Sequence, residues 1–229
     1  MSRPSAALGL VVDGANNKLY YRLGGSVNQI RVKDLNDGNT NPGVLLRSVN
    51  TTVNSLDLDP QRQRLYWTDN EAEFRIKSMS TDGSGVQTVV QRSGFMSSVV
   101  VDPSLEYLFW MEAGLGIYRA KLNGSNQVQM APYAGNARSG LVLDGWGNRA
   151  YWTEVDKIRY TDLLPGSSVN TLMNLSFSEG ALTFLYSAEF TPTPTNTATR
   201  FRFSANATHS PRTVWRPRNG EKPKKTPMA

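Results

Sequence analysis

The stretch Leu65-Tyr66-Trp67-Thr68-Asp69 decides the fold of this chain. Altered copies of it return at Leu19-Tyr20-Tyr21, Leu108-Phe109-Trp110-Met111-Glu112 and Ala150-Tyr151-Trp152-Thr153-Glu154. The first aromatic residues of successive copies are separated by 46, 43 and 42 residues. A period in this range indicates a repeat architecture, because one sheet of four short strands fits into it.

Each repeat contains four short apolar runs that are separated by polar turns. The first run ends at an Asp followed by Pro or Gly, and this Asp precedes the aromatic pair by seven residues in every copy, at Asp13, Asp59, Asp102 and Asp144. Asp accepts hydrogen bonds from backbone N–H groups two residues on, and an adjacent Pro or Gly favours chain reversal. We therefore expect one turn geometry to be used four times, with four strands in each repeat.

Tyr66 and Trp67 are neighbours in a strand, so their side chains point to opposite faces of the sheet. Each sheet then needs a neighbour on both faces, which stacking around an axis provides. The sequence predicts an all-β chain that forms a partial β-propeller of four-stranded blades over residues 7–184. About four blades are expected, plus the start of a fifth at Ser178–Thr183, after which the pattern stops.

Residues 185–229 have a different composition, rich in Pro, Thr and Arg and without strand alternation. From residue 191 onward eight basic residues face one acidic residue, a net charge of +7, whereas residues 1–190 carry 17 basic and 18 acidic residues. The net charge of +6 for the chain therefore comes from its tail. We expect a disordered basic tail; nucleic-acid binding by this tail is an alternative function, but nucleic acid is not the expected partner.

The repeat resembles the YWTD repeat (class B repeat) of the low-density lipoprotein receptor family. The resemblance covers about residues 7–175 and rests on Tyr66-Trp67-Thr68-Asp69 with upstream Asp59-Pro60 and downstream Met79 and Asp82-Gly83-Ser84. The stretch 117–125 resembles the third strand and turn of such a blade. The structural motif comprises Asp59, Tyr66, Trp67, Thr68, Asp69, Asp102, Trp110, Asp144, Tyr151 and Trp152. In that family six blades close a ring that binds protein ligands, in receptors that are anchored in a membrane and act in endocytosis or signalling. The resemblance implies an extracellular or cell-surface module of a larger protein; no signal peptide and no membrane-spanning run occur in this sequence.

Family ligands use the rim formed by the loops between the second and third strands and between successive blades. On this rim the sequence places four acidic or aromatic residues besides an exposed Phe95, namely Glu71, Glu73, Tyr133 and Asp156. Acidic groups beside an aromatic ring can receive a basic protein partner. We expect these five residues to contribute to protein binding.

The sequence offers little for catalysis, since its only histidine, His209, lies in the tail. We expect no enzyme, no cofactor and no metal. The alternative is a lactonase-like propeller hydrolase with a calcium ion at its centre, where Asn54 and Asp57 are the nearest candidates. Without histidines in the repeats, ligand binding is expected to be nearly independent of pH over roughly pH 5 to 7.5.

Four sequons for N-glycosylation begin at Asn50, Asn123, Asn174 and Asn206. Cysteine is absent, which excludes disulfides and thiolate metal sites. Four and a fraction blades form an open arc whose end strands expose backbone and apolar groups, so we expect self-association through these open blade edges.

Overall fold

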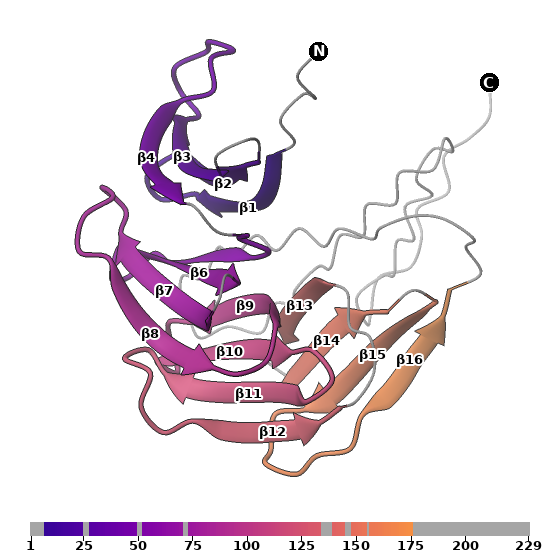
Figure 1. Cartoon of the computed structure of the whole chain (residues 1–229). Helices are drawn as coiled ribbons and strands as arrows, with labels where there is room; N and C mark the ends of the chain where they lie inside the picture. The colour runs from indigo at the N-terminus through magenta and orange to yellow at the C-terminus, as the bar shows by residue number, and fades with distance from the viewer. Residues whose placement is uncertain are drawn as a thin grey trace, which may run out of the picture.

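A computed structural model describes residues 7–24, 28–49, 52–70, 73–133, 139–144, 148–154 and 156–175. These residues form four antiparallel sheets of four strands, each sheet built from consecutive strands of the chain (Figure 1). No helix long and apolar enough to cross a membrane occurs among them. The expected start of a fifth blade at Ser178–Thr183 and the expected tail, residues 185–229, lie outside the described residues.

The sheets follow the repeats of the sequence one by one. The first sheet comprises β1 (Ala7–Asp13), β2 (Lys18–Leu23), β3 (Asn28–Asp34) and β4 (Val44–Val49). The second comprises β5 (Leu56–Asp59), β6 (Arg64–Asn70), β7 (Phe74–Ser80) and β8 (Gln87–Arg92). The third comprises β9 (Met96–Asp102), β10 (Tyr107–Glu112), β11 (Gly116–Lys121) and β12 (Val128–Pro132). The fourth comprises β13 (Ser139–Asp144), β14 (Arg149–Thr153), β15 (Lys157–Asp162) and β16 (Asn170–Asn174).

The first strands of the sheets meet at the centre of the molecule. β1 contacts β5, β5 contacts β9, and β9 contacts β13, whereas the fourth strands lie at the periphery (Figure 1). The sheets fan out about this centre as propeller blades do. The predicted all-β propeller with four-stranded blades is confirmed, and the first to fourth blades follow one another in chain order.

The turn between the first and second strands has one geometry that recurs in all four blades. In the second and third blades one carboxylate oxygen, Oδ1 of Asp59 or Asp102, accepts the backbone N–H groups two and three residues on, at 3.0 to 3.1 Å. The fourth residue after each Asp adopts a positive φ of 48° to 59°: Asn17, Gln63, Glu106 and Asn148. The carbonyl of this residue then accepts the N–H of the residue that follows the third strand, in every blade, at 2.6 to 3.1 Å.

The aromatic pair of each blade is divided between two interfaces. The second aromatic packs toward the preceding blade and the first toward the following one, because neighbours in a strand face opposite sides. Three buried clusters accordingly contain the pairs Tyr20 with Trp67, Tyr66 with Trp110, and Phe109 with Trp152. The three tryptophans are at most 1% exposed and occupy equivalent positions, so one packing arrangement holds each pair of blades together.

The blades also approach one another closely at the periphery. A Cβ on Gly124, in the turn between β11 and β12, would lie 1.8 Å from the carbonyl oxygen of Val89 on β8. At Gly83, one blade earlier, the corresponding distance to the oxygen of Leu46 is 2.9 Å. Both glycines have a positive φ, so backbone conformation and space each require glycine there.

Candidate binding surfaces

The loops between second and third strands and between successive blades form one rim, which we call the loop rim. Phe95, between β8 and β9, is 42% exposed on it. Its ring lies edge-on against the ring of Phe74, with 6.2 Å between centroids. Glu73, next to Phe74 in sequence, is exposed and accepts a hydrogen bond from Nε2 of Gln91 at 3.2 Å besides its ion pair with Arg75. Phe95 and Glu73 thus both lie on the loop rim of the second blade, but Phe95 contacts Phe74, whereas Glu73 contacts Arg75 and Gln91.

A residue that the sequence did not single out extends this surface onto the third blade. Leu115, in the turn between β10 and β11, is 44% exposed. Backbone hydrogen bonds fix its position, because Ala113 N donates to Phe95 O at 2.8 Å and Tyr133 N donates to Leu115 O at 3.1 Å. The sequence signal that could have identified Leu115 is its place in a short turn beside Gly114, since a turn residue is not needed for packing within the blade.

The other rim candidates lie apart from Phe95 and Glu73. Tyr133 is half-buried and lies edge-on against Trp152, 5.4 Å between centroids. Asp156 is exposed on the fourth blade, where its carboxylate lies 3.3 Å from Lys157 Nζ. Glu71 lies outside the described residues.

Two of the four sequon asparagines, Asn50 and Asn206, lie outside the described residues as well. Asn123 is part of the turn after β11, where its Oδ1 accepts hydrogen bonds from N and Oγ of Ser125 at 3.0 and 2.7 Å. Asn174 is the exposed last residue of β16.

Directly beneath the loop rim, each of the last three blades has an acidic residue at or just after the end of its second strand, and this residue pairs with a cation. Asp69 pairs with Lys77, Glu112 with Arg92 at 3.0 Å, and Glu154 with Arg159 at 3.1 Å; the three cations are partly exposed. Asp69 and Glu112 are at most 1% exposed. A buried carboxylate is costly without its cation, so these pairs hold the rim loops in place.

The cation comes from a different strand in the third blade. In the second and fourth blades it stands on the third strand, opposite the tryptophan: Lys77 pairs with Trp67 and Arg159 with Trp152 in the strand register. In the third blade that position holds Tyr118. Arg92 reaches over from β8 instead, binds Glu112 and places its guanidinium 4.6 Å from the Tyr118 ring centroid. The second and third blades are therefore coupled electrostatically as well as by packing.

Asp57 on β5, named above as a candidate for a central calcium ion, serves as a bridge between blades. Its Oδ2 accepts the N–H of Val101 on β9 at 2.7 Å, and its Oδ1 accepts the N–H of Leu58 at 2.9 Å. Burial raises the pKa of this carboxyl to about 7, although the two N–H groups oppose the shift. The pKa of this carboxyl group therefore lies near neutral pH, the range in which histidine usually titrates, although the repeats contain no histidine. Among the described residues, no group of three or more His, Cys, Asp or Glu side chains is placed to hold a metal ion.

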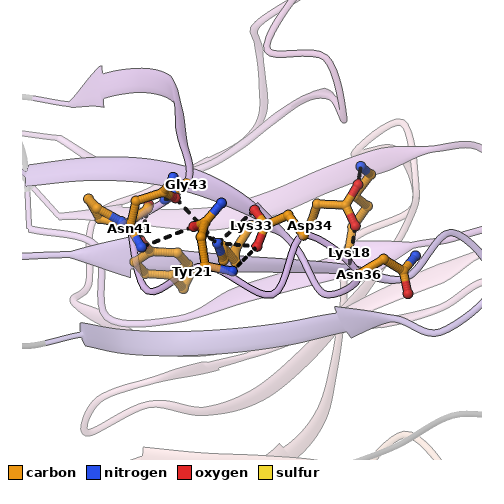
Figure 2. Close-up of polar contacts among 10 residues, drawn as sticks. Lys18, Tyr21, Lys33, Asp34, Asn36, Asn41 and Gly43 are labelled. Carbon is orange, nitrogen blue, oxygen red and sulfur yellow. Dashed lines mark hydrogen bonds and ion pairs between the residues drawn. The ribbon is translucent and has the colours of Figure 1, made fainter.

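A cleft of about 500 Å³ opens on the opposite rim, between the first two blades. Its charged lining consists of Lys18, Asp34, Asp37 and Asp82. Lys18 Nζ binds Asp34 Oδ2 at 2.6 Å, and this bond lowers the pKa of the Asp34 carboxyl (Figure 2). The carboxylates that line the cleft are already paired with cations or turn donors, as Asp82 is with Ser84.

The long loop between β3 and β4 closes over the side chain of Lys33. Lys33 Nζ donates to both carboxylate oxygens of Asp37, at 2.5 and 2.7 Å, and to the side-chain oxygens of Asn39 and Asn41 (Figure 2). The loop is further fixed by Tyr21, whose hydroxyl donates to the carbonyl of Pro42. An ammonium group thus fills the centre of this loop.

The architecture and the rims define a β-propeller, and comparison with solved structures agrees. The chain resembles a chain of a nidogen–laminin complex with a TM-score of 0.67 and 17% identity, over 76% of this chain and 67% of that one. The likeness to TolB from Acinetobacter baumannii has a TM-score of 0.60 and 16% identity, over 76% of this chain and 45% of the TolB chain. The likeness to a gluconolactonase from Xanthomonas campestris has a TM-score of 0.52 and 13% identity, over 80% of each chain.

At these identities the likeness concerns the fold alone. The descriptions of the neighbours differ, since one names a complex of two proteins and another a gluconolactonase. No protein-family model matches the chain.

Proposed function

We propose that this chain is a non-catalytic, extracellular protein-binding and spacing module of the low-density lipoprotein receptor type, carried by a membrane-anchored receptor that acts in endocytosis or signalling. The YWTD-like repeats and the likeness to a chain of the nidogen–laminin complex support this assignment. The loop rim is the proposed contact surface.

One observation carries the proposal: two large apolar side chains, Phe95 and Leu115, stay exposed on loops that are otherwise firmly held. Backbone hydrogen bonds and the buried Arg92–Glu112 pair fix these loops, so a partner pays little ordering entropy on binding. Exposed apolar groups on the same rim as an exposed acidic residue, Glu73, fit a partner segment that carries both an apolar side chain and a Lys or Arg.

Selection from a display library of random linear peptides tests this proposal. The immobilised chain is the bait, and enriched peptides are expected to combine an apolar residue with a basic one. Phe95→Ala and Leu115→Ala should each weaken binding of such a peptide by about tenfold, which corresponds to about 1.4 kcal/mol. Isothermal titration calorimetry on the purified variants measures this.

Leu105→Ala is the matched control, because Leu105 is 50% exposed but lies on the opposite rim. Its affinity for the same peptides should equal that of the unsubstituted chain. Equal loss in all three variants, or enrichment of peptides indifferent to Phe95 and Leu115, contradicts the proposal.

A further inference from the structure

The first blade exposes two side chains whose counterparts in the other blades are buried. Leu10 stands three residues before the turn Asp, where the later blades have Leu56, Val99 and Leu141. Those three are 1 to 6% exposed and belong to the clusters with the preceding blade, whereas Leu10 is 47% exposed. Val12, 52% exposed, corresponds in the same way to Leu58 at 5% and Val101 at 8%.

Strand register shows which face of the first blade these residues occupy. Leu10 lies opposite Tyr21, and Val12 lies opposite Leu19. The intervening pair, Val11 and Tyr20, faces the second blade. Leu10, Tyr21 and Val12 therefore form the face turned away from the second blade, which we call the leading face.

The fourth blade shows the complementary half of the same pattern on its outer face. Met173 pairs with Ile158 in the register and is 49% exposed. The equivalent pair in the second blade is Ile76 with Val90; both are at most 1% exposed and pack toward the third blade. Tyr151 has the place of Tyr66 and belongs to none of the buried clusters. Tyr151, Ile158 and Met173 form what we call the trailing face.

We propose that two copies of this chain associate head to tail, with the trailing face of one packed on the leading face of the next. The interface between consecutive blades occurs three times within the chain and always joins one face of each kind. In the described residues, the fourth blade presents one half of this interface and the first blade the other. Met173 of one copy would then meet Leu10 and Val12 of its neighbour, as Val90 shares a buried cluster with Val99 and Val101 within the chain.

The contact is heterologous, because different surfaces of the two copies meet. Each copy keeps one unused face, so association continues until a ring closes or a chain of copies forms. A two-fold symmetric contact, in which two leading faces meet, predicts a dimer that stops there. The two arrangements differ in how single-face variants behave when they are mixed.

Light scattering coupled to size-exclusion chromatography, run on the full chain over a concentration series, tests the proposal. Leu10→Arg disables the leading face and Met173→Arg disables the trailing face. Each variant alone is expected to run as a monomer where the unsubstituted chain associates. An equimolar mixture is expected to form a dimer and nothing larger, because only one intact pair of faces remains.

Two further variants serve as controls. Val44→Arg places the same charge at a residue that is 66% exposed and shares the side of Val32, which packs toward the second blade, so it should associate as the unsubstituted chain does. Val12→Arg repeats the leading-face test if Leu10→Arg alters the circular dichroism spectrum.

Each remaining outcome overturns the proposal. These outcomes are an unsubstituted chain that is monomeric at all concentrations, a mixture that stays monomeric, an effect of Val44→Arg equal to that of Leu10→Arg, and a Met173→Arg variant that still dimerises.

Discussion

The interfaces between blades and the outer faces of the first and fourth blades are made of the same residue types but differ in burial. Val90 and Val99 are 1% exposed between the second and third blades, while Met173 and Leu10, at the equivalent positions of the fourth and first blades, are half exposed. The repeat pattern alone assigns all of them to interfaces. A repeat sequence therefore specifies which face can pack, whereas the neighbouring blade determines how much stability that face contributes.

The largest difference between the two regions is expected for the aromatic residues. Trp110→Ala removes a completely buried side chain and should lower the free energy of unfolding by about 3 to 5 kcal/mol. Tyr151→Ala, on the trailing face, should cost less than half as much. Urea denaturation at a concentration where the chain is monomeric compares the two, and equal losses would show that the trailing face is packed like an interface.

Gly124 and Gly166 separate the effect of an interface from that of backbone conformation. Both have a positive φ, of 85° and 83°, but a Cβ meets Val89 O at Gly124 and nothing within 4 Å at Gly166. Gly166→Ala should cost about 1 kcal/mol from backbone strain alone. Gly124→Ala should cost about 2 kcal/mol or more beyond that, because β8 and β11 must separate. Thermal unfolding of both variants measures the difference, and similar midpoints would refute the close approach.

Valine-to-threonine substitutions compare equivalent positions on the two kinds of face. Val101→Thr buries a hydroxyl in the interface with the second blade and should cost about 1 to 3 kcal/mol. Val12→Thr, at the equivalent exposed position, should change stability by about 0.5 kcal/mol or less. Denaturation midpoints of the two variants test this, and a cost at Val12 as large as at Val101 would mean that its face is already covered.

Asp57 makes one interface dependent on pH. Its raised pKa, about 7 against an ordinary 3.8, means that the folded chain keeps a proton which the unfolded chain has lost between these values. Stability should therefore fall as pH rises through this window, by about 1 kcal/mol or more between pH 5 and 8. Asp57→Asn should remove that slope; because the amide keeps only one of the two acceptor oxygens, the comparison concerns the pH slope and not the absolute stability. The lowered pKa values of Asp34, Asp37 and Asp82 act below 3.8, outside the window; an unchanged slope in the variant would contradict the assignment.

Much of the fold could be predicted because it depends on local sequence. The Asp at seven residues before each aromatic pair, such as Asp59 before Tyr66, sets the turn, and the alternation of Tyr66 and Trp67 requires two neighbouring sheets. Both signals lie within one repeat and recur four times, so the strand count of each blade was readable without coordinates.

The features that could not be predicted from the sequence depend on contacts between residues about one repeat apart. The pKa of Asp57 is raised by burial where its carboxyl group accepts the N–H of Val101 from the next blade. Arg92 supplies the cation for Glu112 because Tyr118 occupies the position that holds a cation in the second and fourth blades. The exposure of Leu115 likewise depends on what the neighbouring loop leaves uncovered. The use of the loop rim in binding stays a prediction, since neither repeat pattern nor packing identifies a ligand.

The consecutive order of strands within each sheet has a mechanical consequence. No described sheet borrows a strand from another, so tension on the two ends of the chain reaches the side-chain contacts between blades before the ladders within them. Blades should detach and unravel singly, each releasing roughly 150 Å of chain for a 42- to 46-residue repeat at about 3.4 Å per residue. Pulling with optical tweezers should give a sawtooth with this spacing, and a single rupture of the whole arc would exclude it. A protein with this construction lengthens in steps under load and gives way gradually.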